Sequence, residues 1–278
     1  MDYQREYEQC LVRIEERLDS FFLQECPQKE LLDAMRYSLL AGGKRIRPVL
    51  TMKFCEVCGG TVEEALDFAC GVEMLHTYSL IHDDLPCMDN DDMRRGKPSN
   101  HKVYGEATAL LCGDALLTEA FSVISESKEL DAEAKVKAIK ALSDYSGIRG
   151  MIGGQQIDLM GEKRRLTQSE HKKMNMLKTG ALIKCACLMG CIAAGADEKA
   201  FEAATAYAEN IGLAFQVTDD ILDMGEEDGK TTYLTFMSKD EAVEYAKQLT
   251  NGAVEAISGY ENSETLIALA RFLQERKI

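Results

Sequence analysis

The chain has 278 residues, of which 46% are hydrophobic, and a formal net charge of −15. Its length and apolar content allow a large buried core, which excludes a disordered chain. The acidic balance argues against a nucleic-acid-binding protein, because such a protein needs a basic surface. Only 4 prolines and no tryptophan occur, and residues that favour helix dominate the composition.

The N-terminal sequence and the cysteines indicate where the protein resides. The first ten residues, MDYQREYEQC, are charged and polar, which is not typical of a secretory signal. We find no uninterrupted apolar run of membrane-spanning length. The ten cysteines lie mostly within apolar or alanine-rich patterns. We therefore expect a cytoplasmic protein with reduced thiols and no membrane span.

Apolar residues at helical spacing recur along the whole chain. Helices are expected at about 1–24, 28–40, 46–58, 62–83, 104–126, 131–147, 148–160, 167–195, 198–224, 239–257 and 263–276. Thr61 with Glu64 predicts a capping box at the start of the fourth helix. No alternating β pattern recurs and no linker divides the chain. We predict one all-α domain over residues 1–278, a helical bundle with a central cavity.

Clustered aspartates end the fourth predicted helix. The segment Leu80–Pro98 reads LIHDDLPCMDNDDMRRGKP and contains Asp83, Asp84 and Asp89. Carboxylates at close range repel each other unless a cation lies among them, and all-oxygen clusters suit Mg²⁺ bound to substrate phosphates. Pro86 interrupts the helix, so a local bulge would bring Asp89 back beside Asp83. A solvated acidic turn is the alternative interpretation.

Cations accompany this cluster. Arg94 and Arg95 follow it directly and suit bidentate recognition of phosphate. Earlier, Gly42–Pro48 reads GGKRIRP, a flexible turn with cations at a helix start, which is typical of an anion site. His76 lies seven residues before Asp83 and therefore on nearly the same helix face. A solvated basic loop and a core histidine are the alternatives.

A helix-interior glycine marks a third segment. Gly180 indicates a kink that turns Lys178 and Thr179 inward. An exposed lysine remains the alternative for Lys178 considered alone.

A second acidic cluster lies in the predicted helix 198–224. Gln216, Asp219 and Asp223 are spaced i, i+3, i+7 and share one helix face. Two acidic clusters facing each other across a bundle could hold metal ions and a diphosphate. Otherwise apolar helices would leave a tunnel for hydrocarbon, so an isoprenoid diphosphate is the expected substrate.

Five ordered motifs resemble the trans-isoprenyl diphosphate synthases, in particular the bacterial farnesyl diphosphate synthase branch. The motifs are GGKRIRP (Gly42–Pro48), HTYSLIHDDLPCMDNDDMRRGKP (His76–Pro98), GGQQIDL (Gly153–Leu159), KTGAL (Lys178–Leu182) and FQVTDDILD (Phe215–Asp223). The resemblance runs over nearly the full length. It implies the isoprenoid synthase fold, a homodimer and three Mg²⁺ per site. The implied reaction condenses isopentenyl diphosphate with dimethylallyl or geranyl diphosphate to give farnesyl diphosphate (C15) and pyrophosphate.

The resemblance also implies roles for individual residues. The Mg²⁺ ligands would be Asp83, Asp84, Asp89, Asp219 and Asp223. The catalytic set would be Asp83, Asp84, Asp89, Asp219 and Lys178. The allylic substrate would contact Arg94, Lys178, Thr179 and Gln216. Isopentenyl diphosphate would contact Lys44, Arg47, His76 and Arg95.

Tyr78 is the expected determinant of product length. It lies five residues before Asp83, more than one helical turn deeper in the bundle. In this family an aromatic residue there goes with products that stop at fifteen carbons, so Tyr78 is expected to close the tunnel floor. A plain core residue is the alternative, and geranylgeranyl diphosphate (C20) is the alternative product.

The sequence departs from the family after Asp223. Only Met224–Gly229 separate Asp223 from Lys230, which matches the second of two family lysines and is expected to bind substrate. The first lysine has no counterpart. A non-catalytic subunit that modulates a partner synthase is therefore an alternative. A terpene cyclase is a third interpretation, against which the Gly42–Pro48 motif counts, since a cyclase needs no second diphosphate site.

Overall fold

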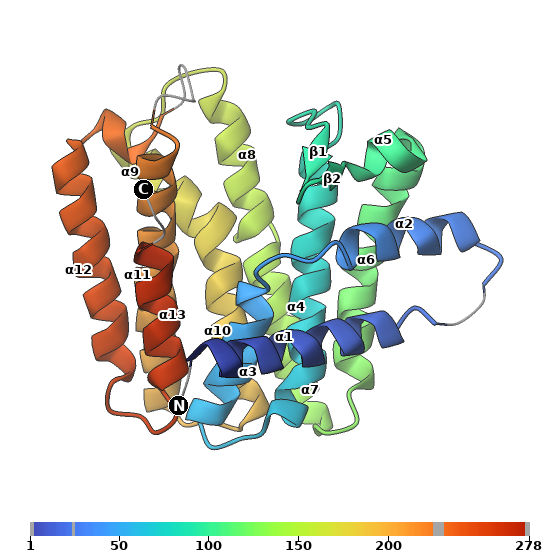
Figure 1. Cartoon of the computed structure of the whole chain (residues 1–278), viewed down its shortest axis with the longest axis horizontal. Helices are drawn as coiled ribbons and strands as arrows, with labels where there is room; N and C mark the ends of the chain where they lie inside the picture. The colour runs from blue at the N-terminus through green and yellow to red at the C-terminus, as the bar shows by residue number, and fades with distance from the viewer. Residues whose placement is uncertain (1–2, 24–25, 225–230, 276–278) are drawn as a thin grey trace.

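The computed structural model describes residues 3–23, 26–224 and 231–275, which form one helical bundle (Figure 1). Its elements are α1 (Tyr3–Ser20), α2 (Lys29–Leu39), α3 (Ile46–Val57), α4 (Val62–Asp83), β1 (Met93–Arg94), β2 (Lys97–Pro98), α5 (Asn100–Tyr104), α6 (Glu106–Glu126), α7 (Ala132–Ser146), α8 (Met151–Gly161), α9 (Gln168–Asn175), η1 (Met176–Gly180), α10 (Ala181–Ala193), α11 (Glu198–Leu222), η2 (Tyr233–Thr235), α12 (Lys239–Ile257) and α13 (Glu264–Gln274). The all-α prediction is confirmed.

The sequence did not predict three short elements between α4 and α6. The strands β1 and β2 form an antiparallel hairpin, and α5 follows it. Arg95 (φ 52°) and Gly96 (φ 75°) are both left-handed, as a tight two-residue hairpin turn requires. Elements of two to five residues are too short to show a hydrophobic period, so pattern analysis misses them.

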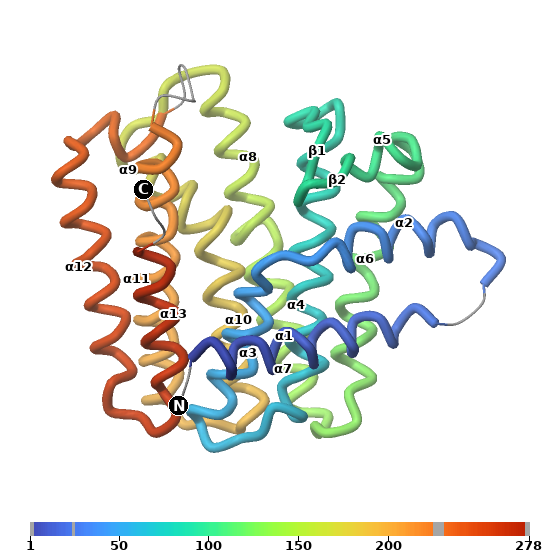
Figure 2. The backbone as a smooth tube through the Cα atoms, in the orientation of Figure 1, coloured from blue at the N-terminus to red at the C-terminus, as the bar shows by residue number. Residues whose placement is uncertain are grey.

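Helix α4 is the centre of the bundle. It packs against α3, α6 and α10, and α1 crosses it (Figure 2). The predicted capping box of Thr61 and Glu64 starts it. A Cβ at Gly71 would lie 2.9 Å from the carbonyl oxygen of Ala120, so α4 and α6 approach closely. A helix buried along most of its length is rigid and presents its last residue, Asp83, in a fixed place.

The predicted kink near Gly180 is a π-helical turn, η1, between α9 and α10. Such turns are frequent at functional sites. A Cβ at Gly154 of α8 would lie only 2.2 Å from the backbone nitrogen of Lys178, so α8 packs directly on this turn. The absence of a side chain at Gly154 therefore allows this close approach.

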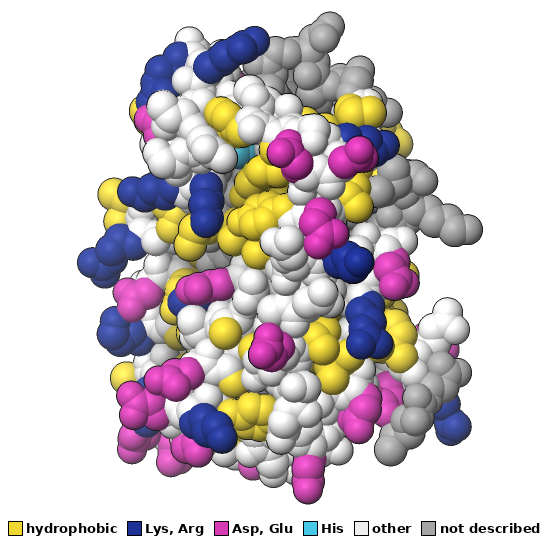
Figure 3. All heavy atoms as spheres, turned by 90° about the vertical axis from the view of Figure 1, so that its left-hand side faces the viewer, with side chains coloured by type: hydrophobic (Ala, Val, Ile, Leu, Met, Phe, Trp, Pro, Cys, Tyr) yellow, Lys and Arg dark blue, Asp and Glu magenta, His cyan; other side chains and the backbone are white. Residues whose placement is uncertain are grey.

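Two helical segments are long and apolar enough to cross a membrane by composition alone, Glu106–Glu126 and Gln168–Ala193. In the most apolar stretch of each segment, the bundle buries 39% of Glu106–Glu126 and 67% of Gln168–Ala193. Core helices of soluble proteins give the same signal, so these segments are weak indications of a span. Figure 3 shows that Lys, Arg, Asp and Glu side chains intermingle over the face that carries α12.

Candidate active site

A cavity of about 610 Å³ lies between α4, α6, α8 and η1. It brings together six of the predicted site residues, namely Arg47, His76, Tyr78, Asp83, Lys178 and Thr179. The rest of its wall is largely apolar and includes Leu85, Leu110, Leu117, Met151, Ile152 and Leu159. A few polar groups converging in an apolar pocket are typical of a small-molecule site. The inward turn of Lys178 and Thr179, and the shared face of His76 and Asp83, are confirmed.

Asp83 and Asp89 lie close together, as predicted. The chain folds back after α4, and the backbone nitrogen of Asp89 donates to the carbonyl oxygen of Asp83 at 2.9 Å. Burial raises the pKa of Asp83 to about 6, and Asp89 adds to the rise while Lys178 opposes it. A partly buried carboxylate beside a second, exposed one fits a hard cation, which would stabilise their charged forms.

Metal coordination itself stays a prediction. Among the residues that the structure describes, no three His, Cys, Asp or Glu side chains converge as ligands. Mg²⁺ needs few protein ligands, because it keeps several waters and binds substrate phosphates.

Asp84 lies in a neighbouring, smaller cavity with Arg94 and Arg95. Its carboxylate accepts from Nε of Arg94 at 2.8 Å, and Nη2 of Arg94 also contacts Asp91 at 2.9 Å. Burial raises the pKa of Asp84, against the lowering effect of Arg94. The roles of Asp84 as metal ligand and of Arg94 as allylic contact stay predictions.

Lys178 has a partner that we did not assign from the sequence. Its Nζ donates to Oδ2 of Asp158 at 2.5 Å. Asp158 lies on α8, one turn after Gln155, which lines the cavity. The motif GGQQIDL contained the signal, since Gln155 and Asp158 are spaced i, i+3 and share a face. Asp158 therefore holds the lysine beside the carboxylate of Asp83.

Arg47 and His76 lie together at one side of the cavity. Nη1 of Arg47 lies 3.2 Å from Nε2 of His76. Burial lowers the pKa of His76 well below 6.5 and that of Arg47 to about 10. The imidazole is therefore neutral near pH 7 and accepts from the guanidinium. Nε of Arg47 is buried and has no hydrogen-bond partner in the described part of the chain, which suits an anionic ligand.

The other two predicted contacts of isopentenyl diphosphate flank this pair. Lys44 lies exposed in the turn before α3. Arg95 lies in the smaller cavity and donates to the carbonyl oxygen of Gly42 at 2.7 Å.

The second acidic cluster lies at the end of α11, which reaches the same end of the bundle as the C-terminal end of α4 (Figure 1). Gln216 and Asp219 are half-buried and Asp223 is exposed; none of the three lines the cavity. That the second acidic cluster faces Asp83 across a shared metal site stays a prediction. Lys230, the predicted substrate contact, lies outside the described residues, as do residues 225–229.

Comparison with known proteins gives the family. The polyprenyl synthetase family model matches residues 28–235. A geranylgeranyl diphosphate synthase of Cyanophora paradoxa is 46% identical over 262 residues, which cover 88% of this chain and 87% of the relative. The heterodimeric geranylgeranyl pyrophosphate synthase large subunit 1 of Arabidopsis thaliana is 42% identical, with 88% and 72% covered.

Solved structures agree in fold. An FPP/GFPP synthase from Zymomonas mobilis superposes with a TM-score of 0.93 at 37% identity, covering 98% of both chains. A geranyltransferase from Legionella pneumophila superposes with a TM-score of 0.93 at 34% identity, covering 99% of this chain and 98% of the other. The motifs, the all-α bundle and these matches show that the chain belongs to the polyprenyl synthetase family of trans-isoprenyl diphosphate synthases, which are prenyltransferases.

Proposed function

We propose that this protein condenses isopentenyl diphosphate with an allylic diphosphate and releases geranylgeranyl diphosphate (C20) and pyrophosphate. The observation that carries the proposal is the cavity itself, where Asp83, Lys178 and Arg47 border an apolar space. Such a space accepts a charged head and a hydrocarbon tail. The C20 product is supported by the relatives at 41–46% identity, which are named geranylgeranyl diphosphate synthases.

Each side of the cavity has its own task in this reaction. Asp83 and Asp89 would hold Mg²⁺, with Asp219 and Asp223 as the expected ligands from α11. Bound Mg²⁺ would neutralise the charge of the departing pyrophosphate. Lys178, fixed by its ion pair on α8, contacts the same leaving group.

The site of the second substrate, isopentenyl diphosphate, serves mainly to orient it. Arg47 and His76 hold isopentenyl diphosphate so that its double bond faces the allylic carbon. The apolar wall excludes water, which would otherwise capture the allylic cation. The proton lost after bond formation passes to the released pyrophosphate.

Farnesyl diphosphate (C15), which the motifs predicted, is the second candidate product. A specific observation favours it: Tyr78 borders the cavity, is only 5% exposed, and packs edge-on against His82 with ring centroids 5.6 Å apart. A ring in this place would limit the depth available to the growing chain. The names of the solved structures include farnesyl and geranyl transfer, whereas those of the curated relatives favour C20.

We also propose a homodimer. Helix α6 exposes Leu111, and Val136 of α7 and Ile148 before α8 are exposed as well, Ile148 to 85%. The resemblance to the trans-isoprenyl diphosphate synthases motivates this proposal, and these exposed apolar residues are candidates for its interface. Sedimentation analysis tests this, and a mass of one 30.9 kDa chain would contradict it. The cytoplasmic location stays a prediction, and five plant relatives are named chloroplastic.

Product analysis tests the function. The purified chain is incubated with Mg²⁺, labelled isopentenyl diphosphate and dimethylallyl, geranyl or farnesyl diphosphate, and products are separated by chain length. A C20 product is expected. A C15 limit would favour the second candidate. No product from any starter would favour the non-catalytic subunit.

A further inference from the structure

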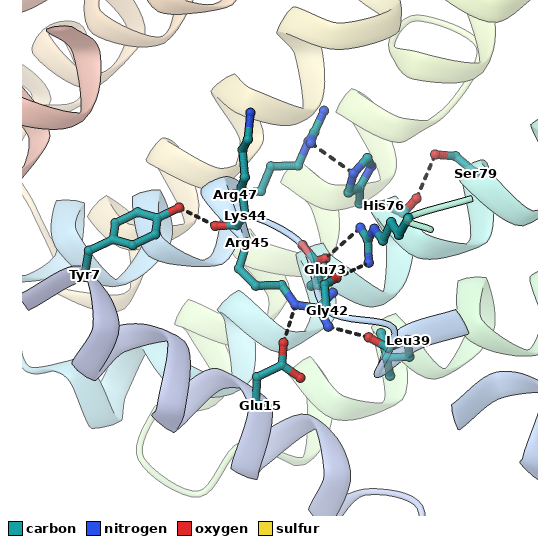
Figure 4. A network of polar contacts seen from close by, with 11 residues as sticks. Tyr7, Glu15, Leu39, Gly42, Lys44, Arg45, Arg47, Glu73, His76 and Ser79 are labelled. Carbon is teal, nitrogen blue, oxygen red and sulfur yellow. Dashed lines mark hydrogen bonds and ion pairs between the residues drawn. The ribbon is translucent and has the colours of Figure 1, made fainter. Parts of the chain in front are cut away.

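A buried acidic residue lies within the cation-rich side of the site (Figure 4). Glu73 of α4 is 1% exposed and precedes His76 by one helical turn. Its Oε1 accepts from Nη1 of Arg45 at 2.6 Å and lies 3.5 Å from Nη2 of Arg95. Burying a carboxylate is costly unless cations compensate for lost water, so this arrangement calls for an explanation beyond packing.

All three nitrogen atoms of the Arg45 guanidinium donate hydrogen bonds to protein groups. Besides Glu73, it donates from Nε to Glu15 at 2.7 Å and from Nη2 to the carbonyl oxygen of Leu39 at 2.5 Å. Its side chain is inaccessible to solvent, so it does not bind a ligand. Its backbone is left-handed (φ 48°) directly before α3, which is uncommon for a residue with a side chain. Anchoring Arg45 therefore fixes the turn.

The anchored turn directs the two flanking cations. Figure 4 shows Lys44 and Arg47 extending to the side of the network opposite Glu15, with Arg47 directed at His76. The position of Arg45 between them in the chain means that a shift of its backbone would move both.

Arg95 reaches the same carboxylate from the β1–β2 hairpin. Its Nη1 donates to the carbonyl oxygen of Gly42 at 2.7 Å. Its guanidinium lies against Gly43, where a Cβ would be 3.1 Å from Cζ. Arg95 is also left-handed (φ 52°). Glu73 is thus the shared anion that joins the hairpin, the glycine turn and α4.

We propose that Glu73 is the positioning residue of the isopentenyl diphosphate site. Its buried carboxylate holds Arg45 and Arg95, and through them orders the turn that carries Lys44 and Arg47. It does not contact the substrate, since a carboxylate repels a diphosphate and Oε1 already serves two guanidinium groups. The inference rests on the proposed function, because it concerns one substrate of that reaction.

The substitution Glu73→Gln tests the charge while keeping the shape and one acceptor oxygen. The Kd and KM for isopentenyl diphosphate should rise about tenfold or more, the loss of roughly one charge-assisted contact. The KM for the allylic diphosphate and kcat should change less than about threefold, because Asp83 and Lys178 lie outside the network. A merely structural role would affect both substrates alike.

Asp67→Asn is the matched control. Asp67 is also buried on α4, and it pairs with Arg17 of α1 at 2.8 Å, away from the cavity. This variant should lose stability comparably but keep its affinity for isopentenyl diphosphate. If Glu73→Gln does not fold, Glu15→Gln removes the more exposed partner of Arg45 and should raise the same Kd severalfold.

A double-mutant cycle of Glu73 and Arg95 gives the sharpest test of the positioning role. If Glu73 acts partly through Arg95, the loss in the Glu73→Gln, Arg95→Gln double variant should be smaller than the product of the two single losses. An unchanged Kd in Glu73→Gln, or equal rises for both substrates, overturns the inference.

Binding by calorimetry separates this inference from the proposed function, because it needs no turnover. If the wild-type chain binds isopentenyl diphosphate but forms no product, the proposed function is refuted. The comparison of Kd between the wild type and Glu73→Gln then still decides the role of Glu73. A wild-type chain that does not bind isopentenyl diphosphate refutes both.

Discussion

Replacing Tyr78 with alanine should lengthen the longest product by at least one five-carbon unit. At 1.5 Å per residue, Tyr78 lies about 7.5 Å deeper along α4 than Asp83. Its ring borders the cavity, together with Leu117 and Met151. Removing the ring opens space directly beneath the site where the chain grows. Each added CH₂ that enters an apolar space gains about 0.8 kcal/mol, so a longer chain would use that space.

The protein should tolerate this change. Truncating a buried aromatic residue costs about 3–5 kcal/mol. The cost of truncating Tyr78 should lie at the lower end of this range, because its ring borders an existing cavity and its hydroxyl has no partner within the described residues. A loss of about 3 kcal/mol corresponds to a fall in Tm of about 6–12 °C. A folded, active variant is therefore expected.

Product chromatography of Tyr78→Ala beside the wild type is the assay. Tyr78→Phe is the matched control, since it keeps the ring and removes only the unpaired hydroxyl, and it should leave product length unchanged. A folded, active Tyr78→Ala enzyme with the wild-type product distribution would refute the tunnel-floor role.

Three further predictions concern the polar side of the cavity. Asp158→Asn should lower kcat/KM for the allylic substrate by about ten- to a hundredfold in steady-state assays, because Lys178 loses the partner that fixes it. The control is Asp144→Asn, which should have no effect, since the carboxylate of Asp144 pairs with the exposed side chain of Lys140. The contribution of His76 to the free energy of unfolding should fall as the pH drops below 6.5, since the unfolded chain then protonates His76 whereas the folded chain, with a lowered pKa, does not. Urea titrations should show a smaller pH slope for His76→Gln, and an identical slope would contradict this. Chelation should abolish product formation, added Mg²⁺ should restore it, and full activity in excess chelator would refute the metal requirement.

The helices and the main site residues could be predicted because they depend on local patterns. The apolar period of α4 and its terminal aspartates lie in one continuous segment, and Gly180 marks the kink at Lys178. The fold-back of Asp89 followed from Pro86, which breaks the helix. These features need only spacing and residue type.

Contacts between distant segments could not be predicted. The pair of Asp158 and Lys178 joins two helices, and Glu73 pairs with Arg45 and Arg95 from two different turns. Spacing within one helix does not show which charge from another segment lies opposite. Product length depends in the same way on the depth of a cavity with walls from several helices, which is why the motifs favoured C15 while the relatives favour C20.

Product formation by the purified protein with Mg²⁺, labelled isopentenyl diphosphate and geranyl diphosphate distinguishes prenyl transfer from substrate binding alone. We expect one pyrophosphate released per condensation and geranylgeranyl diphosphate as the main product. A product that stops at C15 would keep the chemistry and overturn the proposed length. Binding of both substrates without any new carbon–carbon bond would refute the proposed prenyl transfer.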